Sequence, residues 1–298
     1  MTLSDRSVKA MSSALAIVML SLMSAALAET PLTTKIADPE DGSVAAGAYT
    51  NDYFRLSYPL PPGWVEGLKG PPPSYTAYYV LASLESSAPE QPSLLIVAQD
   101  LFFGARPLMS AKQAAGELRN AEAQVPQMTI DREPTETRIA DHSFIRVDYS
   151  AGGLYRAWFA TELRCHLVIF NFTTTDAAAL ETAVHSLDKM SLPSEAPANG
   201  EAASAVPACI HDYATSENVV HRVEPAQIGP RFLKIPVRVI IGAEGDAKHI
   251  HVISGFPEQK TAIETALSQW RFKPYEVQGH PAEVETGLIF EFKPSQNN

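Results

Sequence analysis

The stretch from residue 235 to residue 292 limits the possible folds of this chain more than any other part of the sequence. Residues 236–241 alternate as half-buried strands do, and residues 248–253 repeat this pattern after a turn in which Gly245 can adopt a positive φ. Between Glu258 and Arg271, apolar residues recur at three- and four-residue spacing, which predicts a helix packed on this hairpin. Residues 283–292 alternate again. The order predicts a small ββαβ unit.

This region, residues 233–293, is similar to the C-terminal domain of the TonB family. The similarity rests on the turn-bearing hairpin, the Ser254-Gly255 break, and Trp270-Arg271-Phe272-Lys273-Pro274 followed by Gly279 and a strand. In that family the domain binds partners in the cell envelope, often by pairing a sheet edge with an extended peptide, and no reaction is implied. The resemblance thus implies a partner-binding domain, assigned to residues 209–298, with no catalytic residue.

The last strand is the predicted binding site. If it lies at the edge of the sheet, its unpaired backbone groups can pair with an incoming peptide. The residues predicted to contact the partner are Glu283, Glu285, Ile289 and Glu291 on this strand, and Arg271 and Lys273 at the end of the helix. The alternative is that the charged side chains protect the edge against pairing. A homodimer formed by exchange of edge strands also stays open.

Residues 1–28 have the composition of a secretory signal peptide. Arg6 and Lys9 precede the apolar residues 11–22, and Ala26-Leu27-Ala28 fits a cleavage site. Cleavage there predicts a periplasmic protein. The alternative is an uncleaved segment that anchors the chain in the membrane, as a TonB-type energy transducer requires. Such transducers also need a long proline-rich spacer, where this chain has a folded domain.

Residues 48–192 are predicted to form an α+β domain. Strands are expected at 53–58, 75–82, 93–99, 128–138, 141–149, 154–163 and 165–173. Helices are expected from an N-cap at Ser110 and from Thr175 or Asp176 through Leu187. This order predicts an antiparallel sheet with helices packed on it. Together with the Pro61-Pro62-Gly63-Trp64 turn, it resembles the PsbP-like domains, whose roles vary. Residues 29–47 are predicted to be a mobile leader and 193–208 a linker.

The sequence lacks the common catalytic and nucleotide-binding motifs, so the chain is predicted to be non-enzymatic and without a cofactor. Its formal charge of −11, with no basic stripe, argues against nucleic-acid binding. His249 and His251 share a strand face, where His280 or Glu283 could add a metal ligand. Two ligands without motif spacing instead favour solvent-facing histidines, so no metal is assigned. A metal-dependent hydrolase stays an alternative function.

Cys165 and Cys209 are an even pair, and both a disulfide between the two domains and two unpaired cysteines stay open. Taken together, the sequence predicts a secreted envelope protein whose C-terminal domain binds an envelope protein or peptide. An outer-membrane receptor in TonB-dependent transmembrane transport would fit this prediction. Whether the first domain holds a ligand stays open.

Overall fold

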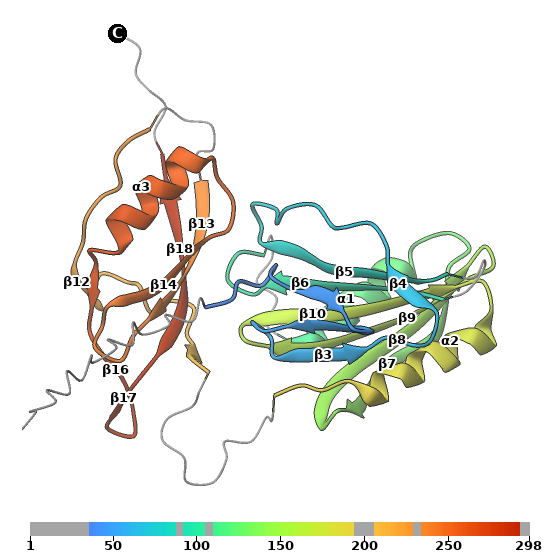
Figure 1. Ribbon diagram of the computed structural model, residues 1–298. Helices are drawn as coiled ribbons and strands as arrows, with labels where there is room; N and C mark the ends of the chain where they lie inside the picture. Colours follow the sequence, from blue (N-terminus) through green and yellow to red (C-terminus); the bar gives the residue numbers. More distant parts are fainter. Residues whose placement is uncertain (1–35, 88–91, 105–109, 194–205, 229–233, 293–298) are drawn as a thin grey trace, which may run out of the picture. The chain divides into compact units, whose positions relative to one another are not determined.

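A seven-stranded antiparallel sheet forms the first half of the described chain (Figure 1). The computed structural model describes residues 36–87, 92–104, 110–193, 206–228 and 234–292, so the predicted signal peptide and most of the linker lie outside the described residues. The strands stand in the order β4 (Trp64–Glu66), β5 (Tyr78–Ser86), β6 (Ser93–Asp100), β10 (His166–Thr174), β9 (Leu154–Leu163), β8 (His142–Ala151) and β7 (Thr129–Ile139). The α+β prediction for this region is confirmed.

Each face of this sheet carries its own apolar cluster, because successive side chains of a strand point to opposite faces. On β10, Phe170 and Phe172 lie on the face that packs with Leu180 of α2 (Ala177–Val184). Leu167 lies on the other face with Ala115 of α1 (Ala111–Glu122). The face toward α2 is also covered by a three-stranded sheet of β1 (Ser43–Ala45), β2 (Ala48–Asn51) and β3 (Leu56–Pro59).

The helix caps follow the prediction, but several boundaries differ. Ser110 accepts a hydrogen bond from the Gln113 N–H (3.1 Å), and Asp176 caps α2. The second helix becomes a 3₁₀ helix from His185 to Lys189 instead of continuing to Leu187 as an α-helix. The residues predicted as a leader contain β1. The predicted strand at 53–58 begins only at Leu56, because Arg55 has a positive φ of 50° and turns the chain.

The second half contains the predicted strand, turn, strand, helix, strand order. Its strands are β13 (Lys234–Ile241), β14 (Ala247–Val252) and β18 (Val284–Glu291), and α3 (Pro257–Leu267) follows β14. A short strand, β11 (Ala208–Cys209), pairs in parallel with β18, which gives the order β11-β18-β13-β14. Two further pairs are too short to show a periodicity: β12 (Val219–His221) with β15 (Arg271–Phe272), and β16 (Tyr275–Val277) with β17 (His280–Ala282).

The two faces of the four-stranded sheet have different surroundings. Val237 and Phe290 face α3 and pack with Ile263 and Trp270 in one apolar cluster. The opposite face carries Arg238, whose guanidinium contacts Asp100 of the first half as well as Glu285 on the neighbouring strand. Residues 36–298 accordingly form one compact unit.

A disulfide also joins the two halves. Cys165, in the turn between β9 and β10, is bonded to Cys209 of β11, with 5.7 Å between the Cα atoms. Of the two alternatives that the sequence left open, the structure therefore has the disulfide.

Candidate functional site

The outer edge of β18 is the candidate binding site, and only its second part is open. The Ile210 N–H donates to the Glu285 carbonyl (3.1 Å), so the segment around β11 occupies the start of this edge. Every second residue of a strand directs its backbone groups to the same edge, so Gly287, Ile289 and Glu291 direct theirs to this side. No strand in the described part of the chain pairs with them there. The open edge therefore spans Gly287 to Glu291.

The residues predicted on this strand have different surroundings. Ile289 is 57% exposed, and Glu291 is exposed with its carboxylate 3.2 Å from the Lys234 ammonium. Glu283 lies just before β18 and pairs with Lys248. The expectation that Glu285 flanks an open edge is corrected: its side chain is 2% exposed and points into the first half of the chain.

Arg271 and Lys273 do not lie along the edge of β18. Arg271 is part of β15, which pairs with β12, and its guanidinium donates to the Trp270 carbonyl (2.6 Å). The Lys273 N–H donates to the Asn218 carbonyl (2.8 Å). Both side chains are exposed, so they remain available to a partner, but no strand pairing brings them to the Ile289 edge.

A pocket of about 330 Å³ adjoins the open edge. It is lined by Ala214, Arg222, Glu224, Pro225, Trp270, Leu288, Ile289, Phe290 and Glu291. Since these include four successive residues of β18, a strand added at this edge would place one of its side chains at the pocket mouth. The lining combines apolar side chains with one guanidinium and two carboxylates. It therefore suits an apolar side chain of a bound peptide whose next residue is polar.

A buried ion cluster joins the face of the second sheet to the first half. The Arg238 guanidinium donates to an Asp100 carboxylate oxygen (2.5 Å) and to a Glu285 oxygen (3.2 Å), and all three side chains are at most 2% exposed. Arg164 lies 3.3 Å from the other Glu285 oxygen, and the Tyr53 hydroxyl donates to Glu285 (2.7 Å). Two cations and two anions therefore balance in the interior.

The ionisation of this cluster depends on its partners. Burial alone would raise the pKa of Glu285, but Arg238 and Arg164 outweigh burial and lower this pKa. Burial raises the pKa of Asp100 despite Arg238. His166, which is completely buried beside the cluster, has its pKa held well below the usual value by burial and by Arg238, so it is neutral. The cluster therefore links Arg238 and Glu285 of the second half to Asp100 and Arg164 of the first half.

The prediction that His249 and His251 face solvent is wrong. His249 Nε2 lies 2.8 Å from an Asp38 carboxylate oxygen, and His251 Nε2 lies 2.9 Å from a Glu40 oxygen. Both histidines thus bind the segment that precedes β1. Among the described residues, no group of three His, Cys, Asp or Glu side chains could hold a metal ion.

The ion cluster is the feature that sequence reasoning missed. The sequence does contain one indication of it, because Arg238 is the single charged residue within the apolar run 235–241. A charged residue at such a position is buried only when it is paired. Its partner Asp100 lies 138 residues away in the sequence, so no local spacing could identify the pair.

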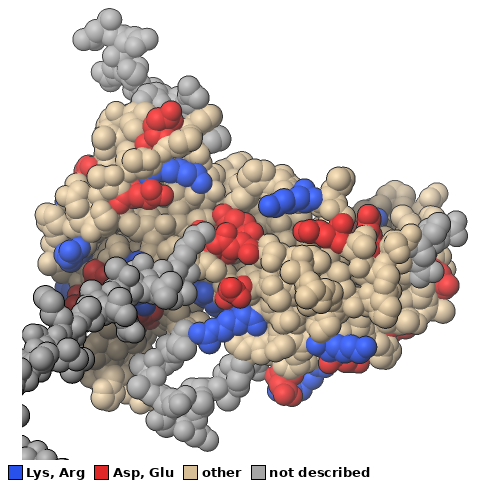
Figure 2. Space-filling view, in the orientation of Figure 1, with Lys and Arg blue, Asp and Glu red and all other residues tan. Residues whose placement is uncertain are grey.

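Surface charge gives little indication of a nucleic-acid partner. On the face drawn in Figure 2, acidic and basic side chains are interspersed and no basic patch is visible.

The described helices include none with the length and apolarity needed to span a membrane. The disulfide is typical of proteins outside the cytoplasm.

Comparison with known proteins finds solved structures that are similar to about half of the chain. No family model matches, and no curated protein matches. The solution structure of PsbP (CyanoP) from Synechocystis sp. PCC 6803 is similar over 51% of this chain and 96% of that chain, with 14% identity and a TM-score of 0.36. The crystal structure of LpqN, involved in cell envelope biogenesis of Mycobacterium tuberculosis, is similar over 46% of this chain and 83% of that chain, with 10% identity and a TM-score of 0.31.

A third solved structure, a protein of unknown function from Pseudomonas aeruginosa, is similar over 45% of this chain and 85% of that chain, with 22% identity and a TM-score of 0.28. At these identities the likeness concerns the fold alone. Because no family model matches, the resemblance to the TonB C-terminal domain rests on the sequence motifs of this chain alone.

Proposed function

We propose that this protein is a non-enzymatic, periplasmic binding protein whose second half pairs with an extended segment of an envelope protein along the open edge of β18. The single observation that supports this proposal most is the row of outward backbone groups at Gly287, Ile289 and Glu291, which no described strand covers. The sequence resemblance to the TonB C-terminal domain supports the same role. An outer-membrane receptor in transmembrane transport is the partner that this resemblance suggests.

The register of β18 explains why the edge can be tested without breaking the sheet. Pro236 lies opposite Ile289 and has no N–H, and its carbonyl accepts from Ile253 on the β14 side. The N–H and C=O of Ile289 therefore belong to the outer edge, not to the ladder with β13. Replacing Ile289 by proline removes an outward donor and leaves the bonds to β13 in place.

The test has two steps: the partner is captured by crosslinking in cells, and its affinity for the full mature chain is then measured. A photo-crosslinking amino acid at position 289 should form a discrete adduct with an envelope protein in cells, whereas the same amino acid at Leu154, which is 38% exposed in the first half, should not. The affinity for the captured partner should fall at least tenfold for Ile289→Pro and stay within about twofold for Ile289→Thr, which keeps the donor. Equal affinities of the two variants would contradict pairing at this edge.

A further inference from the structure

The disulfide is attached to the strand that covers the start of the proposed binding edge. β11 has two residues, and one of them, Cys209, is bonded to the turn between β9 and β10. The Ala208 N–H donates to the Glu283 carbonyl (2.8 Å), and the Ile210 N–H donates to the Glu285 carbonyl (3.1 Å). The same short segment therefore carries the disulfide and covers the first two outward carbonyls of the edge.

β11 is too short to hold this position well by strand pairing. Strands of globular proteins usually have about 3–10 residues, and β11 has two. The half-buried side chains of Ala208 and Ile210 pack against the apolar cluster of the second half, which adds a limited contact. The covalent bond, in contrast, keeps Cys209 beside the β9–β10 turn, with 5.7 Å between the Cα atoms of the two cysteines. We therefore expect β11 to need the disulfide in order to stay on the edge.

The two cysteines differ in their access to solvent. Cys165 is 8% exposed, whereas Cys209 is exposed. A thiolate reduces a disulfide by attacking one of its two sulfur atoms, and access helps to decide which sulfur atom is attacked. A reductant can therefore reach Cys209, and the thiolate of Cys165 is the leaving group.

Other contacts join the two halves of the chain independently of the disulfide. The Arg238 guanidinium donates to Asp100, and His249 Nε2 lies 2.8 Å from an Asp38 oxygen. Neither contact includes a residue of β11 or a cysteine. Opening the disulfide should thus leave the two halves in contact, so its effect is local.

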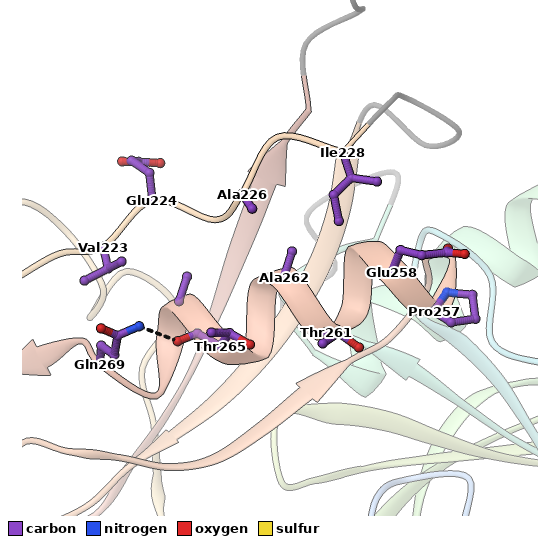
Figure 3. A pocket seen from close by; sticks show the side chains of 11 residues that line it. Val223, Glu224, Ala226, Ile228, Pro257, Glu258, Thr261, Ala262, Thr265 and Gln269 are labelled. Atoms are coloured by element: carbon purple, nitrogen blue, oxygen red, sulfur yellow. Dashed lines mark hydrogen bonds between the residues drawn. The ribbon is translucent and has the colours of Figure 1, made fainter.

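The chain after β11 is fixed at further points. Tyr213 is buried, and its hydroxyl donates to the Lys273 carbonyl (2.7 Å). The Trp270 indole N–H donates to the Val223 carbonyl (2.7 Å), and from Val223 to Ile228 the chain follows α3 (Figure 3). A released β11 can therefore move only as far as the Tyr213 anchor allows, and the apolar cluster under α3 stays in place.

We propose that the disulfide is a redox latch: a dithiol protein reduces it, and β11 then leaves the β18 edge. The first thiolate of the dithiol bonds to the Cys209 sulfur and breaks its bond to Cys165, whose thiolate takes up a proton. The second thiol attacks the mixed disulfide and releases Cys209 as a thiol. The reductant becomes a disulfide, and this protein gains two electrons and two protons.

The latch regulates the length of the edge, and its effect on binding rests on the function proposed for that edge. After release, the outward backbone groups of Glu283 and Glu285 join those of Gly287, Ile289 and Glu291. The open edge then extends from residue 283 to residue 291, roughly 30 Å at 3.3 Å per residue. A longer extended segment can pair with it.

The first test uses the full mature chain alone, with and without dithiothreitol and without denaturant. It measures hydrogen exchange of single backbone amides by NMR. In the reduced chain, the amides of Ala208 and Ile210 should exchange within about threefold of the rate of an unstructured peptide, because local opening needs no global unfolding. The amides in the centre of β13 should stay protected at least 100-fold. The double variant Cys165→Ser with Cys209→Ser is the matched control and should show the open pattern with or without dithiothreitol.

Three results of this test would overturn the latch. The first is a disulfide that dithiothreitol does not reduce in the folded chain. The second is continued protection of Ala208 and Ile210 in the reduced chain or in the double variant. The third is loss of protection in β13 together with β11, because the whole chain then unfolds on reduction.

The second test measures the affinity of the partner captured by crosslinking at position 289. The reduced chain should bind it at least tenfold more tightly than the oxidised chain, because more backbone groups pair with it. Equal affinities in the two redox states would overturn the regulation of the edge by the latch. Release of β11 without capture of a partner in either state would contradict the function proposed for the edge, but not the latch.

Discussion

Replacing Arg238 by methionine tests whether the buried ion cluster holds the two halves of the chain together. Methionine keeps the approximate length of the side chain but removes the charge, which leaves the carboxylates of Asp100 and Glu285 buried without their main cation. Removing one partner of a buried ion pair costs about 3–5 kcal/mol. We expect a loss of that size in the free energy of unfolding at pH 7, measured by urea denaturation.

The pH dependence of this loss gives a second, independent readout. In the parent, the pKa of Glu285 is lowered, so its stabilisation is present above the unfolded carboxyl pKa of about 4.3 and is lost as the pH falls through the lower folded value. Without Arg238, burial dominates and raises the pKa of both carboxyls. They then take up protons on acidification, so the difference between variant and parent should shrink from pH 7 to about pH 4.

The matched control is Arg132→Met. Arg132 also pairs with a carboxylate, Asp148 (2.8 Å), but its side chain is 44% exposed, so the expected loss is below about 1 kcal/mol. The reasoning is refuted if Arg238→Met costs no more than this control, or if its cost is the same at pH 4 and pH 7.

Three further predictions concern stability. Cys209→Ser opens the disulfide to Cys165, and because the two residues are 44 positions apart, the loop-entropy relation gives a loss of about 4 kcal/mol in urea unfolding; a loss below about 1 kcal/mol would contradict it. Ser110→Ala removes the N-cap of α1 and should cost about 1 kcal/mol in the same assay, while Ser110→Asp should cost little. Gly245→Ala places a Cβ 2.1 Å from a carbonyl oxygen at a φ of +82°, whereas the Cβ of Gly153→Ala meets no atom within 4 Å at a φ of +80°. Thermal unfolding should therefore show a loss of stability of about 1 kcal/mol for Gly153→Ala and a clearly larger loss for Gly245→Ala.

Long elements with a regular pattern could be predicted from the sequence because local side-chain alternation determines them. Residues 154–163 were predicted as a strand and form β9 with the same bounds. The β13–β14 hairpin was predicted from its alternation and from Gly245, which adopts φ +82° in the turn. The six long strands of the seven-stranded sheet and the helices α1 and α2 belong to this predictable part, whereas the three-residue strand β4 was expected to be a turn.

The parts that could not be predicted depend on contacts between distant residues. The two residues of β11 show no periodicity, and their pairing with β18 covers part of an edge that the sequence left fully open. The polar face of β13 and β14 was expected to meet solvent. It instead places Arg238 and His251 against the first half, because Asp100 and Glu40 are there to pair with them. An alternating pattern shows that a face is polar but not what covers it.

The position of the disulfide has a practical consequence for anyone who divides this protein into fragments. A fragment that begins at Cys209 carries a free thiol in place of the bond to Cys165. It also exposes the guanidinium of Arg238 and the carboxylate of Glu285 on a bare sheet face, next to Gly287, where Phe102 and Phe103 are packed in the whole chain. Such a fragment could join to itself through sulfur or capture unrelated proteins on that face, so screens for true binders require the undivided chain.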